Sequence, residues 1–354
     1  MMTQPQESVT GGGKYLLYTF LGRPVFAVPA NPRRLRRAAL HRLQPSTVKR
    51  AVYRTCVGWS MLARGDWLFS QSVGSPLEQT SGSTFDWENW LHEMREYFGI
   101  THLAAAFFWP TVSGRGRLYA HVFDGTEPVG FAKISLGANS SVRLSREAET
   151  LRRLGAKYLQ AFRVPRLLME GKAGEHLFLL LEPVPTSARP IARRVEAYPH
   201  ESVKEYSDEV RSIGPDMVPT LSWWAKYIGQ TDRQSQQFHD ELISLLDVGT
   251  TVCRVHGDLS PHNVVWDERT LWIYDWEESA PDAPVRSDPI GFALSIRQSA
   301  IRSSPVLETG RFKRRYLKNV KVADRLEIMM ALAFRHAAGI DDATQIIRNW
   351  SSSK

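Results

Sequence analysis

Two short polar segments, each after an apolar run, carry side chains that can bind a hard cation and accept a proton. The first contains His256, Asp258 and Asn263, and the second contains Asp275. Asn263 lies 5 positions after Asp258, and Asp275 lies 17 positions after it. Carboxylate and amide oxygens are ligands that Mg²⁺ prefers, and a carboxylate beside a hydroxyl group can take its proton. The alternative interpretation is that these are ordinary turn residues and that His256 only caps a turn in the core.

The residues around these side chains favour the catalytic interpretation over ordinary turns. The first segment reads HGDLSPHN over residues 256–263, and the second reads IYDWE over residues 273–277. These blocks resemble the HGDLxPxN catalytic loop and the IDWE metal segment of the aminoglycoside phosphotransferase and choline kinase family, the small-molecule branch of the protein-kinase-like fold. The resemblance covers roughly residues 100–349 and is strongest over 255–293. One position departs from the pattern: Gly291 stands where the family commonly has Asp, and Asp288 is the candidate to replace that carboxylate.

The resemblance implies an ATP- and Mg²⁺-dependent transfer of the γ-phosphate to a hydroxyl of a small molecule or sugar. Such a transfer needs positioning and charge neutralisation more than covalent help. Asp258 would be the catalytic base, Asn263 and Asp275 would bind the metal, and His256 would support the loop structurally. A lone His-x-Asp would be weak support, whereas the full spacing is specific.

The family pattern also implies a strand lysine and a helix glutamate. Lys133 lies at the centre of an apolar run, where its charge needs a partner, and it would bind the ATP phosphates. Glu147 would tether Lys133, with Glu149 as the fallback. Without the family pattern, Lys133 would be interpreted as a surface lysine on an edge strand.

Two further segments would contact the nucleotide. Ser113, Gly114 and Gly116 form a turn whose backbone N–H groups would approach the phosphates, although alone it is only a hairpin turn. Glu182 and Val184 match the hinge between lobes, where their backbone would pair with adenine.

The resemblance implies an α+β fold, a bilobal protein-kinase-like fold with an antiparallel-sheet N-lobe and a mostly helical C-lobe, and the charge distribution places a basic N-terminal extension before it. Asp86 or Thr84 is expected to cap a helix that Gly99 ends. The other expected elements follow from hydrophobic periodicity and turn signals. We expect β-runs at 103–109, 118–123, 129–136, 164–169, 176–181 and 271–274, and helical segments at 143–154, 187–247 and 322–350.

Composition predicts the domain organisation. We expect residues 1–13 to be disordered, 14–69 to form the basic extension, 70–84 to be a linker, 85–182 to form the N-lobe and 183–354 the helical C-lobe. Segment 8–65 holds eleven Lys or Arg residues and no acid, within a chain of net charge +8. A run of arginines is most often a solvated face. The functional alternative is attraction to an anionic membrane surface or a polyanion, and nucleic acid ranks last because no such motif is present.

The 354 residues, 43% hydrophobic and 23% charged, are typical of a folded globular protein. The longest apolar stretch is far shorter than the roughly 20 residues that span a bilayer, and no secretory signal is evident. Two cysteines, Cys56 and Cys253, suit a reducing compartment. We therefore expect a cytoplasmic protein, with peripheral membrane attachment as the alternative.

Competing functions remain. A nucleotide-binding pseudokinase that scaffolds a partner is the first, but the intact base and metal positions count against it. A protein kinase is the second, disfavoured because no Ala-Pro-Glu motif follows the metal segment. The acceptor stays open among amino sugars, other sugar or glycan hydroxyls and amino alcohols. Trp223 and Trp224 are either walls of the acceptor pocket or core residues.

Overall fold

The computed structural model describes residues 15–20, 23–42, 55–57, 70–75, 85–109, 116–207, 209–298 and 305–352. The chain divides into two compact units. Unit 1 combines Met1–Leu144 with Leu167–Pro183, and unit 2 combines Ser145–Arg166 with Val184–Lys354. Each unit has its own hydrophobic core.

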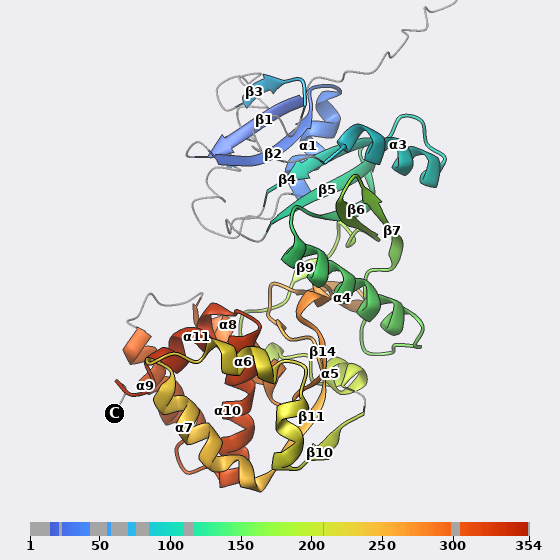
Figure 1. The fold of residues 1–354 in the computed structure, drawn as a ribbon. Coiled ribbons are helices and arrows are strands. Elements are labelled where there is room, and N and C mark those ends of the chain that lie inside the picture. The colour runs from blue at the N-terminus through green and yellow to red at the C-terminus, as the bar shows by residue number, and fades with distance from the viewer. Residues whose placement is uncertain are drawn as a thin grey trace, which may run out of the picture. The chain divides into compact units, whose positions relative to one another are not determined.

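Unit 1 is built on an eight-stranded sheet with the order β3-β1-β2-β4-β5-β6-β8-β7 (Figure 1). Every neighbouring pair is antiparallel. The strands are β1 Tyr15–Phe20, β2 Arg23–Pro29, β3 Ser70–Val73, β4 Ala104–Phe108, β5 Arg117–Asp124, β6 Glu127–Ser135, β7 Leu167–Ala173 and β8 His176–Leu181.

Both faces of strand β4 are buried, and its side chains alternate between two cores. Ala105 and Phe107 enter the core that includes Trp90 of helix α3 (Trp87–Phe98). Ala106 and Phe108 enter the core that includes Leu35 of helix α1 (Arg33–Arg42). Because successive side chains of a strand point to opposite faces, the apolar run of β4 needs a helix on each side.

Helix α3 has the ends that its sequence predicted. The Asp86 side chain accepts a hydrogen bond from the N–H of Asn89 at 3.0 Å, and Gly99 closes the helix in the left-handed conformation with φ 66°. These local signals set where the helix begins and ends.

The sheet includes strands from segments that the predicted domain bounds placed before the N-lobe. Strands β1 and β2 belong to the predicted extension (14–69), yet β2 pairs with β4. Ser70–Val73, which falls in the predicted linker (70–84), forms β3 and pairs with β1. The change in charge along the chain therefore does not mark an edge of the unit, because backbone pairing is indifferent to the charge of exposed side chains.

Unit 2 is mostly helical, and the prediction of an α+β chain with an antiparallel sheet followed by a helical part is confirmed. Helix α4 (Ala138–Gly155) crosses the boundary between the units, which lies after Leu144. The other helices are α5 His200–Tyr206, α6 Trp224–Gln230, α7 Gln236–Leu245, α8 Ser287–Gln298, α9 Pro305–Tyr316, α10 Val322–Ala337 and α11 Asp341–Arg348, with short 3₁₀ turns η2 Val195–Ala197, η3 Pro215–Thr220, η4 Leu246–Val248 and η5 Trp276–Glu278.

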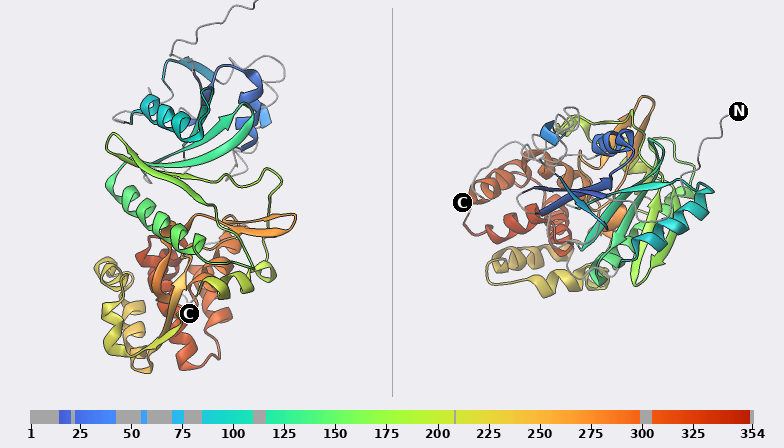
Figure 2. Two further views of the ribbon diagram at one scale, coloured as in Figure 1. Left: turned by 90° about the vertical axis from the view of Figure 1, so that its right-hand side faces the viewer. Right: turned by 90° about the horizontal axis from the view of Figure 1, so that it is seen from above.

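Helix α10 is the centre of the unit 2 core. Its residues are buried almost without interruption from Leu326 to Ala337, as expected of a helix that is apolar all round. Helices α6, α7, α8 and α11 contact it, and Figure 2 shows the red α10 and α11 beside the yellow α6 and α7 in both views. Trp223 and Trp224 are each 6% exposed and belong to this core, as the core interpretation of these residues predicts.

Two small sheets of unit 2 carry the segments of chemical interest. Their strand orders are β10-β11-β14 and β13-β12-β9. The HGDLSPHN segment connects β11 to β12, and Asp275 follows β13. The strands are β9 Arg189–Pro190, β10 Arg211–Ile213, β11 Thr250–Val255, β12 Val264–Asp267, β13 Thr270–Ile273 and β14 Ala280–Pro284.

No helix in the part of the chain that the structure describes is both long enough and apolar enough to cross a membrane.

Candidate active site

The segment 256–263, called the catalytic loop below, turns sharply at its second residue. Gly257 has φ +87°, and a Cβ atom placed on it would lie 2.1 Å from the backbone oxygen of Glu278. A side chain is excluded both by the left-handed backbone and by this contact with a neighbouring backbone segment. The glycine of the motif is therefore required by packing.

A buried carboxylate from helix α8 holds the start of the loop. Asp288, 1% exposed, accepts hydrogen bonds from the N–H of His256 at 2.8 Å and from the N–H of Gly257 at 2.9 Å. The hydroxyl of Tyr206 donates to the same carboxylate at 2.8 Å. Asp288 thus supplies a buried carboxylate to the loop, whereas Gly291 leaves its own position without a side chain.

His256 joins the catalytic loop to the segment after β13. Its Nε2 lies 3.0 Å from the carbonyl oxygen of Tyr274, and its Nδ1 lies 3.3 Å from the N–H of Asp258. A neutral ring that donates through Nε2–H and accepts at Nδ1 satisfies both contacts. The ring also packs against Trp276, with 4.5 Å between ring centroids. The ring of His256 therefore links two backbone segments, and its role as a support of the loop stays a prediction.

Asp258 and Asn263 are brought together inside the loop. The side-chain amide of Asn263 donates to the carbonyl oxygen of Asp258 at 2.9 Å, which orients the side chain and leaves its Oδ1 as an acceptor. The backbone N–H of Asn263 also donates to Ser260 at 3.0 Å. The five positions between Asp258 and Asn263 therefore form a turn that the side-chain amide of Asn263 closes.

The electrostatic environment makes Asp258 a stronger base than an ordinary aspartate. Burial raises the pKa of its carboxyl to about 6. The positive charge of Arg335 opposes this rise, and the negative charge of Asp275 adds to it. A carboxyl with a pKa near 6 is ionised at pH 7 to 8 and still accepts a proton readily.

Three carboxylates meet beside the loop. Oxygens of Glu147, Asp275 and Glu277 all lie within 4.8 Å of one another, and Glu147 also accepts a hydrogen bond from the N–H of Trp276 at 3.3 Å. Asp275 has the left-handed conformation, φ 71° and ψ 55°, which turns the chain at the end of the β12–β13 hairpin. Oxygen donors of this kind fit Mg²⁺. Glu277 stands in the quoted motif, but the sequence assigned it no role.

Arg335 of helix α10 is a further buried charge that the sequence did not reveal. It is 1% exposed, and its guanidinium lies 3.0 Å from the carboxylate of Asp342. Burial would lower the pKa of Arg335, but the carboxylates of Asp342 and Asp258 raise it above its ordinary value. No local pattern shows that this residue reaches the catalytic loop, because Gly257, its partner there, lies 78 positions away.

The nucleotide-binding candidates of unit 1 lie on or next to the sheet. Lys133 lies in β6, 4% exposed, opposite Tyr119 of β5 and Leu179 of β8, so it occupies an inner strand and not an edge. Gly116 has φ +56° and accepts a hydrogen bond from the N–H of Leu136 at 2.6 Å.

The remaining residues that were predicted to contact the nucleotide either lie outside the described residues or are divided between the two units. Ser113 and Gly114 lie outside the described residues. Glu182 falls in unit 1 and Val184 in unit 2. The adenine contacts of these two residues stay predictions, as does the tether between Lys133 and Glu147.

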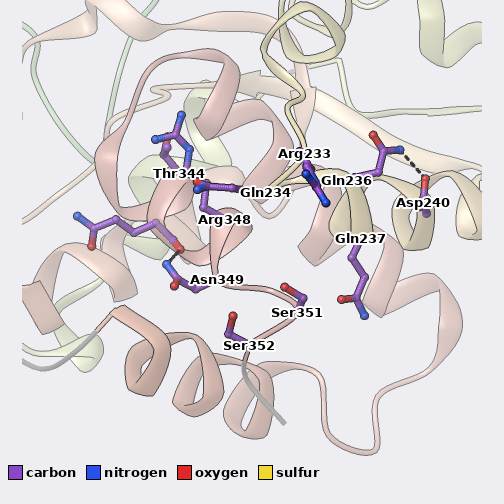
Figure 3. A pocket seen from close by; sticks show the side chains of 11 residues that line it. Arg233, Gln234, Gln236, Gln237, Asp240, Thr344, Arg348, Asn349, Ser351 and Ser352 are labelled. Atoms are coloured by element: carbon purple, nitrogen blue, oxygen red, sulfur yellow. Dashed lines mark hydrogen bonds between the residues drawn. The ribbon is translucent and has the colours of Figure 1, made fainter.

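A separate cavity of about 690 Å³ lies in unit 2 (Figure 3). Its lining is almost entirely amides, hydroxyls and two arginines, and contains none of the residues of the catalytic loop. The lining residues are Arg233, Gln234, Gln236, Gln237, Asp240, Thr344, Gln345, Arg348, Asn349, Ser351 and Ser352.

No family model matches the chain, and no curated protein matches its sequence. Solved structures are similar to it. A thermostable mutant of an aminoglycoside phosphotransferase, in a ternary complex with ADP and hygromycin B, is 12% identical, has a TM-score of 0.46, and the match covers 74% of this chain and 96% of that chain.

Two further structures are similar. The GDP complex of wild-type aminoglycoside 2'-phosphotransferase-IIIa is 14% identical with a TM-score of 0.43, and the match covers 75% and 96% of the two chains. A choline/ethanolamine kinase family protein from Mesorhizobium loti is 12% identical with a TM-score of 0.35, and the match covers 68% and 90%. Identities this low leave the chemistry of this chain to be argued from its own side chains.

Proposed function

We propose that this protein transfers the γ-phosphate of ATP, with Mg²⁺, to a hydroxyl group of a small molecule or sugar. The observation that carries the proposal is the geometry of the catalytic loop. It holds Asp258 and Asn263 together, fixes them through His256 and Asp288, and has Asp275 close enough to raise the pKa of Asp258.

The metal would be held by Asn263 and Asp275, with Glu277 as a further oxygen donor nearby. Bound there, Mg²⁺ would neutralise charge on the β- and γ-phosphates. The chain itself supplies the base. Asp258 accepts the proton of the acceptor hydroxyl as its oxygen forms a bond to the γ-phosphorus, and ADP leaves as the bond from the γ-phosphorus to the β,γ-bridging oxygen breaks.

The other predicted roles stay part of the proposal. Lys133 is assigned to the ATP phosphates from unit 1, and the backbone of Glu182 and Val184 is assigned to adenine. A cytoplasmic location, and the attraction of the basic segment 8–65 to an anionic membrane surface or a polyanion, stay predictions.

The test is an acceptor screen by mass spectrometry of phosphate transfer from ATP, with amino sugars, monosaccharides, lipid-linked sugars and choline-like alcohols. Asp258→Asn is expected to reduce transfer roughly 10³-fold or more with ATP affinity within a few-fold, because the base acts in the transition state. Asp275→Ala is expected to remove the Mg²⁺ dependence of ATP binding instead. Asp247→Asn, an exposed aspartate of η4, is the matched control.

The outcomes separate the competing functions. Transfer to one of the small acceptors supports the proposal. Binding of Mg²⁺-ATP without any turnover, unchanged in Asp258→Asn, would favour a pseudokinase scaffold. Phosphate labelling of a protein, with no small acceptor labelled, would favour a protein kinase.

A further inference from the structure

A glycine on helix α8 leaves room for an arginine on helix α10. A Cβ atom placed on Gly291 would lie 2.1 Å from Nη1 and 2.7 Å from Cζ of Arg335. Contacts that short do not occur between real atoms, so any side chain at 291 requires the guanidinium to move. The absence of a carboxylate at position 291 is thus linked to the presence of this arginine.

The guanidinium has two sets of partners. Nη2 donates to both carboxylate oxygens of Asp342, at 3.2 and 3.0 Å, and Asp342 is itself 7% exposed. Nη1 donates to the backbone carbonyl oxygen of Gly257 at 3.2 Å. The ion pair with Asp342 balances the buried charge of Arg335. Because the guanidinium is planar, the pair also orients Nη1 toward the catalytic loop.

The peptide groups of Gly257 are consequently held on both sides. Its N–H donates to Asp288 of α8, and its C=O accepts from Arg335 of α10. The next residue is Asp258, so the orientation of this peptide sets the direction in which that carboxylate leaves the backbone. Two helices that lie far from the loop in sequence thereby define its conformation.

We infer that Arg335 is a positioning residue for the proposed phosphoryl transfer, which fixes the Gly257 carbonyl and with it the direction of Asp258. The inference rests on the proposed function for its kinetic consequence. Its structural part, that the loop is held by Arg335, can be measured without any substrate.

The first experiment replaces the arginine without leaving a buried charge behind. Arg335→Met combined with Asp342→Asn removes the donor to Gly257 and keeps most of the side-chain volume. Hydrogen exchange of the full-length protein is expected to show about a tenfold loss of protection confined to the loop amides 256–259. Arg325→Met is the matched control, since Arg325 is on the same helix and pairs with the Glu241 carboxylate away from the loop.

The kinetic readout separates positioning from stability. In the double variant kcat for the acceptor found by the screen is expected to fall roughly 100-fold, as for a misplaced catalytic group, with KM for ATP and for the acceptor within about threefold. In Arg325→Met, kcat and loop exchange are expected to stay at the values of the unsubstituted protein.

A second variant approaches the same contact from the other helix and does not depend on how the double variant folds. Gly291→Ala is expected to displace the guanidinium and to produce the same loss of loop protection. In the Arg335→Met, Asp342→Asn background the two atoms that the new Cβ would meet at 2.1 and 2.7 Å are gone, so Gly291→Ala is expected to have no further effect on the loop.

Unchanged loop exchange in both the double variant and Gly291→Ala would overturn the inference, whether or not the protein turns over ATP. Slowed turnover with unchanged loop exchange would overturn it as well. Absence of Mg²⁺-ATP turnover in the unsubstituted protein would instead reject the proposed function, and the exchange data would still decide whether Arg335 holds the loop.

Discussion

The catalytic loop of unit 2 and strand β6 of unit 1 position their charged side chains by different means. Asp258 sits on a loop whose preceding residue, Gly257, hydrogen-bonds to Asp288 and Arg335, two buried side chains from other elements. Lys133 sits in a strand that pairs with β5 along its length and with β8 over residues 131–134. The loop therefore depends on a few individual contacts, whereas the strand depends on a ladder of many.

This difference predicts how each region fails. At the loop, the Asp288 carboxylate accepts several hydrogen bonds. Its removal is therefore expected both to lower the stability of the protein and to displace Asp258. Where a backbone ladder carries the position, a side chain can be exchanged with the loss of its own charge and little else. The substitutions below separate the two cases.

The largest effect on stability is expected for Asp288→Asn. The carboxylate accepts hydrogen bonds from two backbone N–H groups and from the Tyr206 hydroxyl, whereas an asparagine turns one acceptor into a donor that would face another donor. We expect the free energy of unfolding to fall by about 3 kcal/mol and kcat to fall with it. Denaturant unfolding and steady-state kinetics measure the two quantities.

Tyr206→Phe provides the control for Asp288→Asn. It removes one of the three hydrogen bonds and leaves both bonds to the loop, so a loss of about 1 kcal/mol is expected with kcat nearly unchanged. Equal losses in the two variants would show that the loop does not depend on its contacts with Asp288.

A purely chemical loss is expected for Lys133→Met. The methionine fills the space of the aliphatic stem in β6, so the unfolding midpoint is expected to stay close to that of the unsubstituted protein. The affinity for Mg²⁺-ATP is expected to fall roughly 10- to 100-fold, the range for one lost charge-assisted hydrogen bond. Calorimetric titration with Mg²⁺-ATP measures the affinity.

Lys172→Met is the matched control for Lys133→Met, because Lys172 is an exposed lysine of strand β7 in the same sheet. Its affinity for Mg²⁺-ATP is expected to be unchanged. A collapse of the fold in Lys133→Met would contradict the idea that the ladder alone holds this strand.

The same difference explains what the sequence could predict. The caps of α3 at Asp86 and Gly99 depend on residues a few positions apart, so the local pattern was sufficient to predict them. The pairing of β1 with β3 depends on segments more than 50 residues apart, and no local signal predicts such a pairing.

The contacts that hold the loop were beyond prediction for the same reason. Arg335 reaches Gly257 across 78 residues, and Tyr206 reaches Asp288 across 82. The sequence raised Asp288 as a replacement carboxylate, but it could not show that the space beside Gly291 is filled by an arginine. A motif predicts which groups do the chemistry and leaves open which buried side chains keep them in place.

The pH dependence of the reaction follows from the raised pKa of Asp258. A protonated carboxyl cannot accept the hydroxyl proton, so kcat/KM is expected to fall about tenfold for each pH unit below about 6 and to be flat between pH 7 and 8. A profile that keeps rising above pH 7, or that has no break near 6, would show that another group limits the reaction.

The same pKa has a consequence for stability that does not require activity. Because the folded protein holds the Asp258 proton more tightly than the unfolded chain does, this residue makes the folded state less stable as the pH rises from about 4 to about 6. Relative to the unsubstituted protein without Mg²⁺, Asp258→Asn is therefore expected to gain about 2 kcal/mol between those pH values and to keep that gain at pH 7. Denaturant unfolding of both proteins at pH 4, 5, 6 and 7 measures the gap, and a gap independent of pH would mean that the Asp258 carboxyl titrates as an ordinary surface aspartate despite its place in the loop.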